Sequence, residues 1–245
     1  MKADPSRQAR LLDLAGLDTR TNQLAHRRAN LPQSKKHAEL AGELEEVSTD
    51  LVRARTAHDD VQCEITKAEA DVQLVRDRAA RNQSRLDAGQ GSAKDLQALQ
   101  HELASLARRQ SELEDVELEV MERAESLGTR VEALVARHEA VAARVTEAAA
   151  ARDEALGTIE AEEADTATRR IEATGDVGEE LLSLYEKIRA QTGVGAAELN
   201  RRTCQGCRLE LMGADLRRIA AAAQDDIVRC EECRRILVRT EHSGL

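Results

Sequence analysis

The chain carries a heptad repeat in the stretch LAGELEEVSTDLVRARTAHDDVQCEITKAEADVQLV, residues 40–75, where apolar side chains recur in alternating steps of four and three. One register continues as Leu44, Leu51, His58, Ile65, Val72, Ala79 and Leu86, and the other as Leu40, Val47, Ala54, Val61, Ala68 and Val75. A heptad sustained over about six repeats is typical of a coiled coil rather than of a helix in a globular domain. The stretch therefore predicts one long helix with a partner along this seam, and it places Cys63 outside the seam.

A second long helix is expected after the segment DAGQGSAKD, residues 87–95. Gly89 and Gly91 favour a turn there, and Ser92 with Asp95 resembles a capping box that starts a helix. The helix after it has its own heptad seam, with polar intrusions at Gln110 and Glu117. One register is Leu99, Leu106, Leu113, Val120, Leu127, Leu134, Val141 and Ala148, and the other is Leu96, Leu103, Gln110, Glu117, Ala124, Val131, His138 and Val145.

These helices predict a long antiparallel hairpin over residues 1–175, with its tip near residues 87–92. Asp4 and Pro5 are a typical start for a first helix, over about residues 5–30, and its main apolar positions are Leu11, Leu14, Leu17 and Leu24. A proline disfavours helix in the residue before it, so a break is expected near residues 31–33, with Ser34 capping the next helix. The two helices on either side of this break would form one arm. A parallel coiled coil between two chains is the alternative.

The composition excludes an ordinary aromatic core, because the chain has no Phe or Trp and one Tyr. One third of its residues are charged, which is typical of long helices. The net charge of −10 is uneven: residues 199–245 hold nine Arg against seven Asp and Glu, so the rest is strongly acidic. The acidic part should repel nucleic-acid phosphates, whereas the C-terminal part tolerates them.

A short junction is predicted over residues 176–198. Gly175 is expected to end the long helix, and Asp176 with Glu179 resembles a second capping box. The segment EELLSLYEKIRAQ, residues 179–191, places Leu181, Leu184, Tyr185 and Ile188 on one helix face. We expect this helix to support the C-terminal domain.

Residues 199–245 contain four of the five cysteines, as Cys204-x2-Cys207 and Cys230-x2-Cys233. Two such pairs suit a tetrahedral Zn²⁺ site with four thiolates, and a closed shell of four cysteines indicates a structural ion rather than a catalytic one. A redox pair would need a βαβ context, and disulfides would need an oxidising compartment. A domain of this size has a small core, so one structural Zn²⁺ would stabilise it. We expect a short helix in GADLRRIAAAAQ and a strand in RILVRT.

The chain resembles the bacterial C4-type zinc ribbon proteins, in which a long helical hairpin precedes a four-cysteine ribbon. The resemblance is carried by LQALQHELASLARRQSELEDVELEVMERAE after the hairpin tip, by ELLSLYEKIR, and by CQGCRLEL and VRCEECRRILVRT. It implies zinc at Cys204, Cys207, Cys230 and Cys233. Some members are implicated in binding messenger RNA and an alternative sigma factor in flagellar gene control.

For function, the leading expectation is a non-enzymatic, zinc-binding coiled-coil adaptor that binds other proteins, active as a monomer or weak dimer. No phosphate-binding loop, nucleophile elbow or acid–base pair indicates an enzyme. The N-terminal stretch lacks the apolar run of a secretory signal, and no stretch suits a membrane span, so a cytoplasmic location is expected. A purely structural spacer is a further alternative.

The runner-up is a nucleic-acid-binding or transcription-related regulator that acts through the ribbon. Its arginines would contact phosphates or a protein partner, whereas in the competing interpretation they pair with nearby carboxylates such as Glu231 and Glu232. These arginines are Arg201, Arg202, Arg208, Arg217, Arg218, Arg229, Arg234, Arg235 and Arg239. The ribbon lacks the aromatic side chains on which single-stranded nucleic acids stack.

Overall fold

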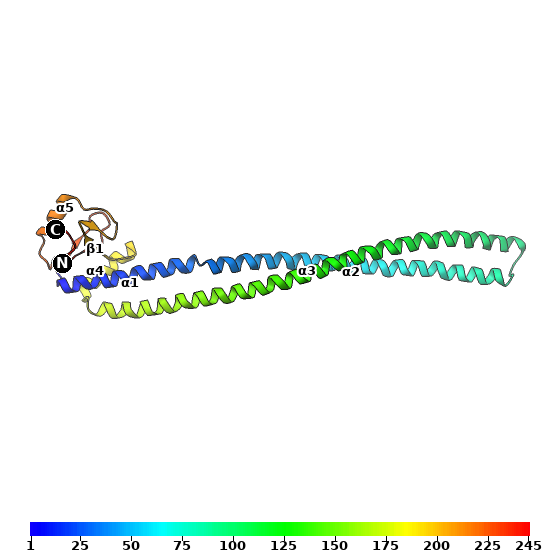
Figure 1. Cartoon of the computed structure of the whole chain (residues 1–245), viewed down its shortest axis with the longest axis horizontal. Helices are drawn as coiled ribbons and strands as arrows, with labels where there is room; N and C mark the ends of the chain where they lie inside the picture. Colours follow the sequence, from blue (N-terminus) through cyan, green and yellow to red (C-terminus); the bar gives the residue numbers. More distant parts are fainter. The chain divides into compact units, whose positions relative to one another are not determined.

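A computed structural model describes residues 1–245, and it divides the chain into two units. The hairpin unit is residues 36–149, and the base unit is residues 1–35 with 150–245. The helices are α1 (Pro5–Ala29), α2 (Pro32–Asp87), α3 (Ala93–Gly175), α4 (Glu179–Thr192) and α5 (Gly213–Ala221) (Figure 1). The strands are β1 (Ala196–Asn200), β2 (Thr203–Cys204), β3 (Val228–Arg229) and β4 (Ile236–Arg239). None of the helices has the length and apolar character that crossing a membrane requires.

In the hairpin unit α2 and α3 pack antiparallel, which confirms the predicted fold class. Ion pairs join the helices with residue numbers that rise along one helix as they fall along the other. They include Arg144–Glu43 at 3.3 Å, Arg123–Glu64 at 3.0 Å and Arg76–Glu114 at 2.6 Å. The turn between the helices is residues 88–92, where Gly89 and Gly91 both have positive φ. The capping box is also present, since Asp95 accepts a 2.9 Å hydrogen bond from the Ser92 amide.

The heptad seam predicted from the sequence is the buried face of this unit. Every predicted seam position in both helices is buried or half-buried, and Val61, Val120 and Ala124 form one of its core clusters. Cys63 is exposed, as expected from its place outside the seam. One seam position escaped the prediction: Asn82, one heptad after Val75, is 8% exposed and its Nδ2 atom has no hydrogen-bond partner.

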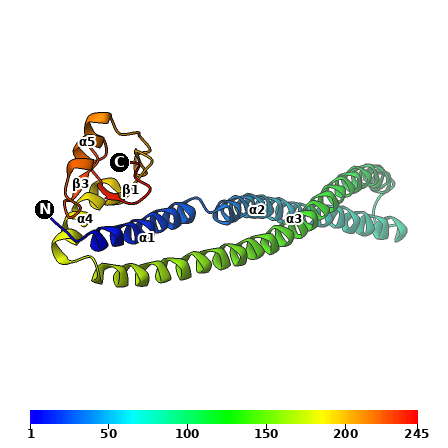
Figure 2. The ribbon, with the colours of Figure 1, turned by 60° about the vertical axis from the view of Figure 1, so that its left-hand side comes forward.

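In the base unit α1 lies beside the last part of α3 (Figure 2). Leu24 and Leu31 pack against Ile159, and Arg28 pairs with Glu160 at 2.7 Å and with Glu163 at 2.8 Å. Within the base unit, α1 therefore packs along the last part of α3, as the lengths of the helices predicted.

The ribbon is built on a four-stranded sheet in the order β2-β1-β4-β3. β1 runs parallel to β4, and both outer strands are antiparallel to their neighbours. Residues 1–3 also contact the ribbon: the Ala3 amide donates to the Asp225 carbonyl at 2.8 Å, and Lys2 pairs with the Asp225 carboxylate at 2.9 Å. The two ends of the chain thus form one folded unit.

Both faces of the sheet are buried, because successive residues of a strand point to opposite sides. On one face Ile236 and Val238 join a core with Leu11, Leu14 and Tyr185 from α1 and α4. On the other face the partners are the α5 residues Leu216 and Ile219 and the cysteines Cys204 and Cys230, which pack against Ala197, Leu199, Val228 and Leu237. The sheet therefore lies between a helical layer and the cysteine layer.

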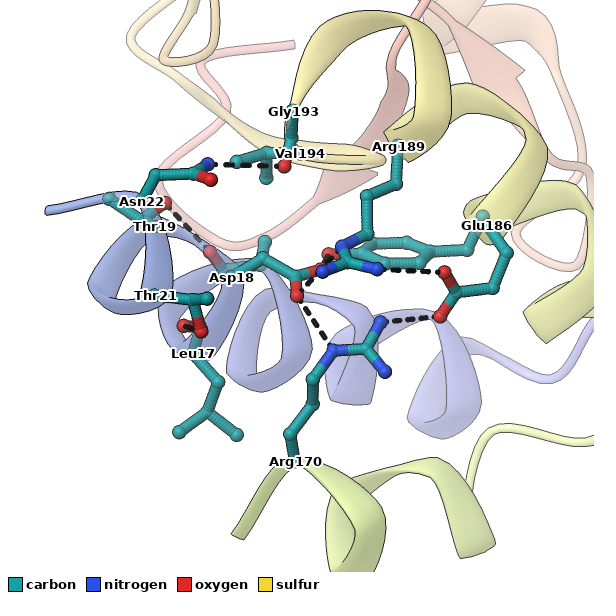
Figure 3. A network of polar contacts seen from close by, with 12 residues as sticks. Leu17, Asp18, Thr19, Thr21, Asn22, Arg170, Glu186, Arg189, Gly193 and Val194 are labelled. Carbon is teal, nitrogen blue, oxygen red and sulfur yellow. Dashed lines mark hydrogen bonds and ion pairs between the residues drawn. The ribbon is translucent and has the colours of Figure 1, made fainter. Parts of the chain in front are cut away.

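A buried carboxylate joins three helices in the base unit (Figure 3). Asp18 on α1 is 1% exposed. Its Oδ1 atom lies 2.7 Å from Arg170 Nε on α3 and 2.9 Å from Arg189 Nε on α4, and its Oδ2 accepts a 2.6 Å hydrogen bond from the Tyr185 hydroxyl. Glu186 bridges the same two guanidinium groups. Burial and the neighbouring Asp18 carboxylate raise the pKa of Tyr185, so its hydroxyl stays protonated and donates.

Two predicted caps are wrong. Ser34 lies inside α2, because Pro32 takes the first helical position, where a proline loses no hydrogen bond. Asp176 does not cap α4; Gly178 is the capping residue, with φ of 87° and no side-chain bond. Asp4, in contrast, caps α1 as predicted, because its carboxylate accepts from the Ser6 amide at 2.8 Å.

The division of the chain also differs from the predicted one. The ribbon sheet begins at Ala196 rather than at residue 199, and the base unit includes α1 and the end of α3. The physical reason is that the sheet needs a helical layer on its second face, and α1 supplies part of it.

We predict that Asp18→Ala destabilises the base unit by about 3 kcal/mol, the low end for a broken buried pair, because Arg170 and Arg189 keep some contact with water. Tyr185 is the only aromatic residue, so its near-ultraviolet circular dichroism reports on this unit during denaturant unfolding. Asp13→Ala, which breaks the exposed ion pair of Asp13 with Arg10 on α1 in the same unit, is the control and should cost less than about 1 kcal/mol. Equal losses for the two variants would contradict a structural role for Asp18.

Candidate metal centre

Two tight turns bring the four predicted cysteines together. Cys204 ends β2 and Cys230 follows β3, and in each pair the second cysteine lies three residues further on. Cys204 Sγ lies 3.8 Å from Cys233 Sγ, and Cys207 Sγ lies 3.9 Å from Cys230 Sγ. All four sulfurs lie within 4.8 Å of one another, and none is in a disulfide.

The arrangement fits a tetrahedral Zn²⁺ ion. With Zn–S bonds of about 2.3 Å, neighbouring sulfurs of a regular tetrahedron are about 3.8 Å apart. Two of the sulfur pairs have this spacing, whereas a disulfide would need about 2.05 Å. His242 is not among the residues that converge on the site. Four cysteines complete the shell, so the ion is structural and has no open position for a substrate.

The two turns have the same backbone geometry. The Cys204 amide donates to the Leu209 carbonyl and the Cys230 amide donates to the Arg235 carbonyl, both at 3.0 Å. The residue after the second cysteine of each pair is an arginine with left-handed backbone, with φ of 61° at Arg208 and 64° at Arg234. That conformation costs a non-glycine residue about 1–2 kcal/mol, so metal binding and the sheet hold the chain in it.

The first turn has Gly206 at the position where the second turn has Glu232, and the neighbours of Gly206 explain the difference. A Cβ atom on Gly206 would lie 2.9 Å from the Ala197 Cβ and 2.8 Å from the Arg235 Cδ. The Arg235 guanidinium crosses this position and donates to the Gly206 carbonyl at 3.2 Å. Only glycine leaves room for it.

The thiol pKa values of the metal-free site depend on burial and on nearby N–H groups. Burial raises the pKa of Cys204 and of Cys230, against hydrogen bonds from backbone amides within their own turns. Burial acts in the same direction on Cys233, but hydrogen bonds from Arg235 leave the pKa of that thiol lowered. Cys204 and Cys230 are therefore protonated at neutral pH without metal, and Zn²⁺ must displace their protons.

The structure separates the nine candidate arginines into three groups. Arg235 and Arg239 are half-buried and hold the ribbon together: Arg235 donates to the Thr192 carbonyl at 2.7 Å, and Arg239 donates to the Ala223 carbonyl at 2.7 Å and the Asp226 carbonyl at 2.9 Å. Backbone carbonyls occupy both guanidinium groups. Because those carbonyls come from other segments of the chain, the positions of the two arginines in the sequence do not reveal this structural role.

The second group is exposed but bonded to neighbours on the surface. Arg218 pairs with Glu231 at 2.9 Å, Arg234 pairs with the same carboxylate at 3.2 Å, and Arg229 donates to the Arg234 carbonyl. For Arg218 and Arg234 this matches the competing interpretation, in which ribbon arginines pair with carboxylates. The third group is exposed and makes no side-chain hydrogen bond or ion pair: Arg201, Arg202, Arg208 and Arg217.

The fold and the cysteine site together define a helical hairpin protein with a C4 zinc ribbon. Residues 14–193 match the family model of the CT398-like coiled coil hairpin domain, and residues 203–237 match that of the C4-type zinc ribbon domain. The chain therefore belongs to the CT398-like coiled-coil hairpin family with a C-terminal zinc ribbon, and its cofactor is one structural Zn²⁺.

Similar proteins include an uncharacterized protein of Mycobacterium tuberculosis, 39% identical over 98% of both chains. A solved structure from Mycobacterium smegmatis has a TM-score of 0.90 and 38% identity, covering 98% of this chain and 100% of that one. The solved structure of CT398 from Chlamydia trachomatis has a TM-score of 0.74 and 17% identity, covering 96% of this chain and 98% of the other. The last likeness supports the fold alone.

We predict one Zn²⁺ per chain in the wild type and a loss of bound zinc in Cys204→Ser, because the buried sulfur is a ligand and serine replaces it poorly. Cys63→Ser changes an exposed cysteine outside the site and should keep the full zinc content. Zinc is measured by inductively coupled plasma mass spectrometry, and ribbon folding by the protection of Leu237 and Val238 amides in hydrogen exchange. Zinc retained in Cys204→Ser at wild-type level would show that the site is not four-cysteine.

Proposed function

We propose that the chain is a non-enzymatic adaptor that binds protein partners through the zinc ribbon. The supporting observation is an apolar and basic surface at α5, which we call the α5 patch: Arg202, Met212, Leu216, Arg217 and Leu245. Met212 is 76% exposed and Leu245 is 52% exposed. Met212 directly precedes Gly213, which lines one pocket together with Leu245. Exposed apolar side chains at one place on a surface often mark an interaction site.

The patch lies on the side of the sheet where a partner has access. The opposite face of the sheet packs on α1 and α4, and its core residues Ala196, Ile236 and Val238 are buried there. On the α5 side a pocket of about 290 Å³ lies between α5 and the C-terminal residues, lined by residues that include Arg202, Leu216, Arg217 and Leu245.

The charges of the patch favour an acidic partner. Arg202 and Arg217 make no ion pair, so both guanidinium groups are available to carboxylates. Met212 is flexible and polarizable, which suits a surface that adapts to an apolar side chain. A partner segment with apolar anchors and Asp or Glu beside them meets both requirements.

We predict that a double change in the patch, Met212→Ser with Arg217→Glu, abolishes capture of partners from native lysate. The captured proteins should survive nuclease treatment and should also be lost with Cys204→Ser, which breaks the ribbon. The matched control is Met121→Ser with Arg130→Glu, which changes a 46% exposed methionine and an exposed arginine of α3 and should leave capture intact. Equal capture by the patch variant and the wild type would refute the patch as the docking surface.

A second candidate is binding of RNA or DNA phosphates by the ribbon. The observation that favours it is the group of four exposed arginines without a partner, Arg201, Arg202, Arg208 and Arg217. Arginine without an intramolecular carboxylate is free to contact phosphate. Arg235 and Arg239 do not join this surface, because backbone carbonyls occupy them.

If phosphates are the ligands, affinity for a fluorescent single-stranded RNA must fall steeply with salt, with a log–log slope of about −3 for four contacts. Arg201→Ala with Arg208→Ala should reduce that slope by roughly one half. The measurement is anisotropy from 50 to 300 mM salt. Binding that is absent at low salt, or independent of salt, contradicts this function.

A further inference from the structure

A groove lined by residues of both helices lies between α1 and the last part of α3 in the base unit. The two helices run side by side there (Figure 2). The volume of the groove is about 1060 Å³. Its lining includes Leu12, Gly16 and Leu17 from α1 and Thr166 and Ala173 from α3. The lining therefore combines small and apolar residues with charged ones, and the charged residues are the larger share.

The groove lies along the continuation of the heptad seam of α3. Seam spacing carried on from Val141 and Val145 reaches Ile159, which packs against Leu24 and Leu31. The next seam positions all line the groove: Glu162, Thr166, Arg169, Ala173 and Asp176. The same holds for α1, where Leu17 lies one heptad before Leu24 and also lines the groove.

The seam opens because α1 uses its larger apolar residues elsewhere. Leu11, Leu14 and Asp18 face α4 and the sheet, where Leu11 and Leu14 are fully buried. The residues left to face α3 are Leu12, Gly16 and Leu17, and Leu12 and Leu17 are only half-buried. Gly16 has no side chain between these two leucines, which leaves a space into which a side chain of another helix fits.

The charges along the groove select the kind of helix. Both arginines that line it are already paired, Arg20 with Glu162 and Arg169 with Asp165. Glu172 and Asp176, at the end near α4, line the groove and have no ion pair. The groove thus has unpaired negative charge and no unpaired positive charge.

We propose that this groove binds a basic amphipathic helix of a partner protein, with apolar knobs against Leu12, Leu17 and Ala173 and lysine or arginine against Glu172 and Asp176. A helix lying in an apolar groove is a common mode of recognition. This inference rests on the proposed protein-binding function. The groove would be a second binding surface, which favours a basic partner, whereas the α5 patch favours an acidic one.

The test uses the zinc-loaded full chain and a fluorescein-labelled peptide of about 18 residues, or five helical turns, with Leu and Ala at heptad core positions and Lys elsewhere. Anisotropy measures its binding, and circular dichroism measures the helix it gains. Gly16→Leu fills the groove at a position with no atom within 4 Å, and should weaken binding about tenfold or more. Glu172→Lys with Asp176→Lys should weaken it as well.

Matched controls distinguish binding in the groove from nonspecific attraction of the peptide to an acidic protein and from loss of binding through misfolding. Gly42→Leu makes the same change at a helix position of α2 that also has no atom within 4 Å, and Glu46→Lys with Glu132→Lys reverses two exposed charges in the hairpin unit. Both should bind the peptide like the wild type. Replacing a helical glycine by leucine favours helix, so loss of binding in Gly16→Leu does not arise from unfolding.

Three results would overturn the proposal: wild-type binding by Gly16→Leu, equal loss in Gly42→Leu, or a dimer of the free chain that Gly16→Leu converts to monomer in sedimentation velocity. The last result would make a second copy the occupant. The α5 patch variant Met212→Ser with Arg217→Glu should bind the peptide normally. If only the groove proposal fails, the peptide does not bind at the groove but proteins are still captured from lysate. If only the adaptor function fails, no proteins are captured, and the anisotropy assay still shows whether the peptide binds.

Discussion

The buried carboxylate of Asp18 is the interaction on which the base unit depends. It contacts a tyrosine and two arginines from two other helices. A chain without Phe or Trp lacks the large side chains that usually fix helices by shape, so a charged network takes that role. Because Asp18 lies on the same face of α1 as Leu11 and Leu14, it also fixes which face of α1 meets the sheet.

That choice of face sets the environment of the metal centre. With α1 and α4 covering one side of the sheet, the other side packs on the cysteine turns, and Cys204 and Cys230 are fully buried. Metal binding and helix packing thus stabilise the same four strands from opposite sides. The ribbon is larger than its cysteine pattern indicates, since residues 1–3 and α1 complete it from the far end of the chain.

The parts of the fold that could be predicted from sequence rest on local periodicity. The heptads predicted α2, α3 and their seam correctly, and the two Cys-x2-Cys pairs predicted which four residues come together as zinc ligands. Each of these patterns is built from units of only a few residues. The role of α1 could not be found in this way. Its four leucines look like one stripe, yet Leu11 and Leu14 meet the sheet, Leu24 meets Ile159, and Leu17 lines the groove. An Asp at an apolar heptad spacing, four residues after Leu14, was the one available signal of a second partner. The nine ribbon arginines show the same limit, since only tertiary contacts separate Arg239, held by carbonyls, from Arg217.

The packing of α1 against both the ribbon sheet with α4 and the end of α3 also accounts for the groove. A helix of 25 residues has one apolar stripe of limited width, and here most of it is used by the sheet and α4. The side toward the end of α3 is left with Leu12, Gly16 and Leu17, and Gly16 has no side chain to fill the space between the two half-buried leucines. The groove is therefore a consequence of completing the ribbon with α1, and not a local defect of packing. The α5 patch follows from the same arrangement, because covering one face of the sheet with helices leaves α5 and the C-terminal residues as the accessible side of the ribbon. An acidic groove and a basic patch in one unit are two chemically distinct surfaces, and the two proposals of protein binding rest on them.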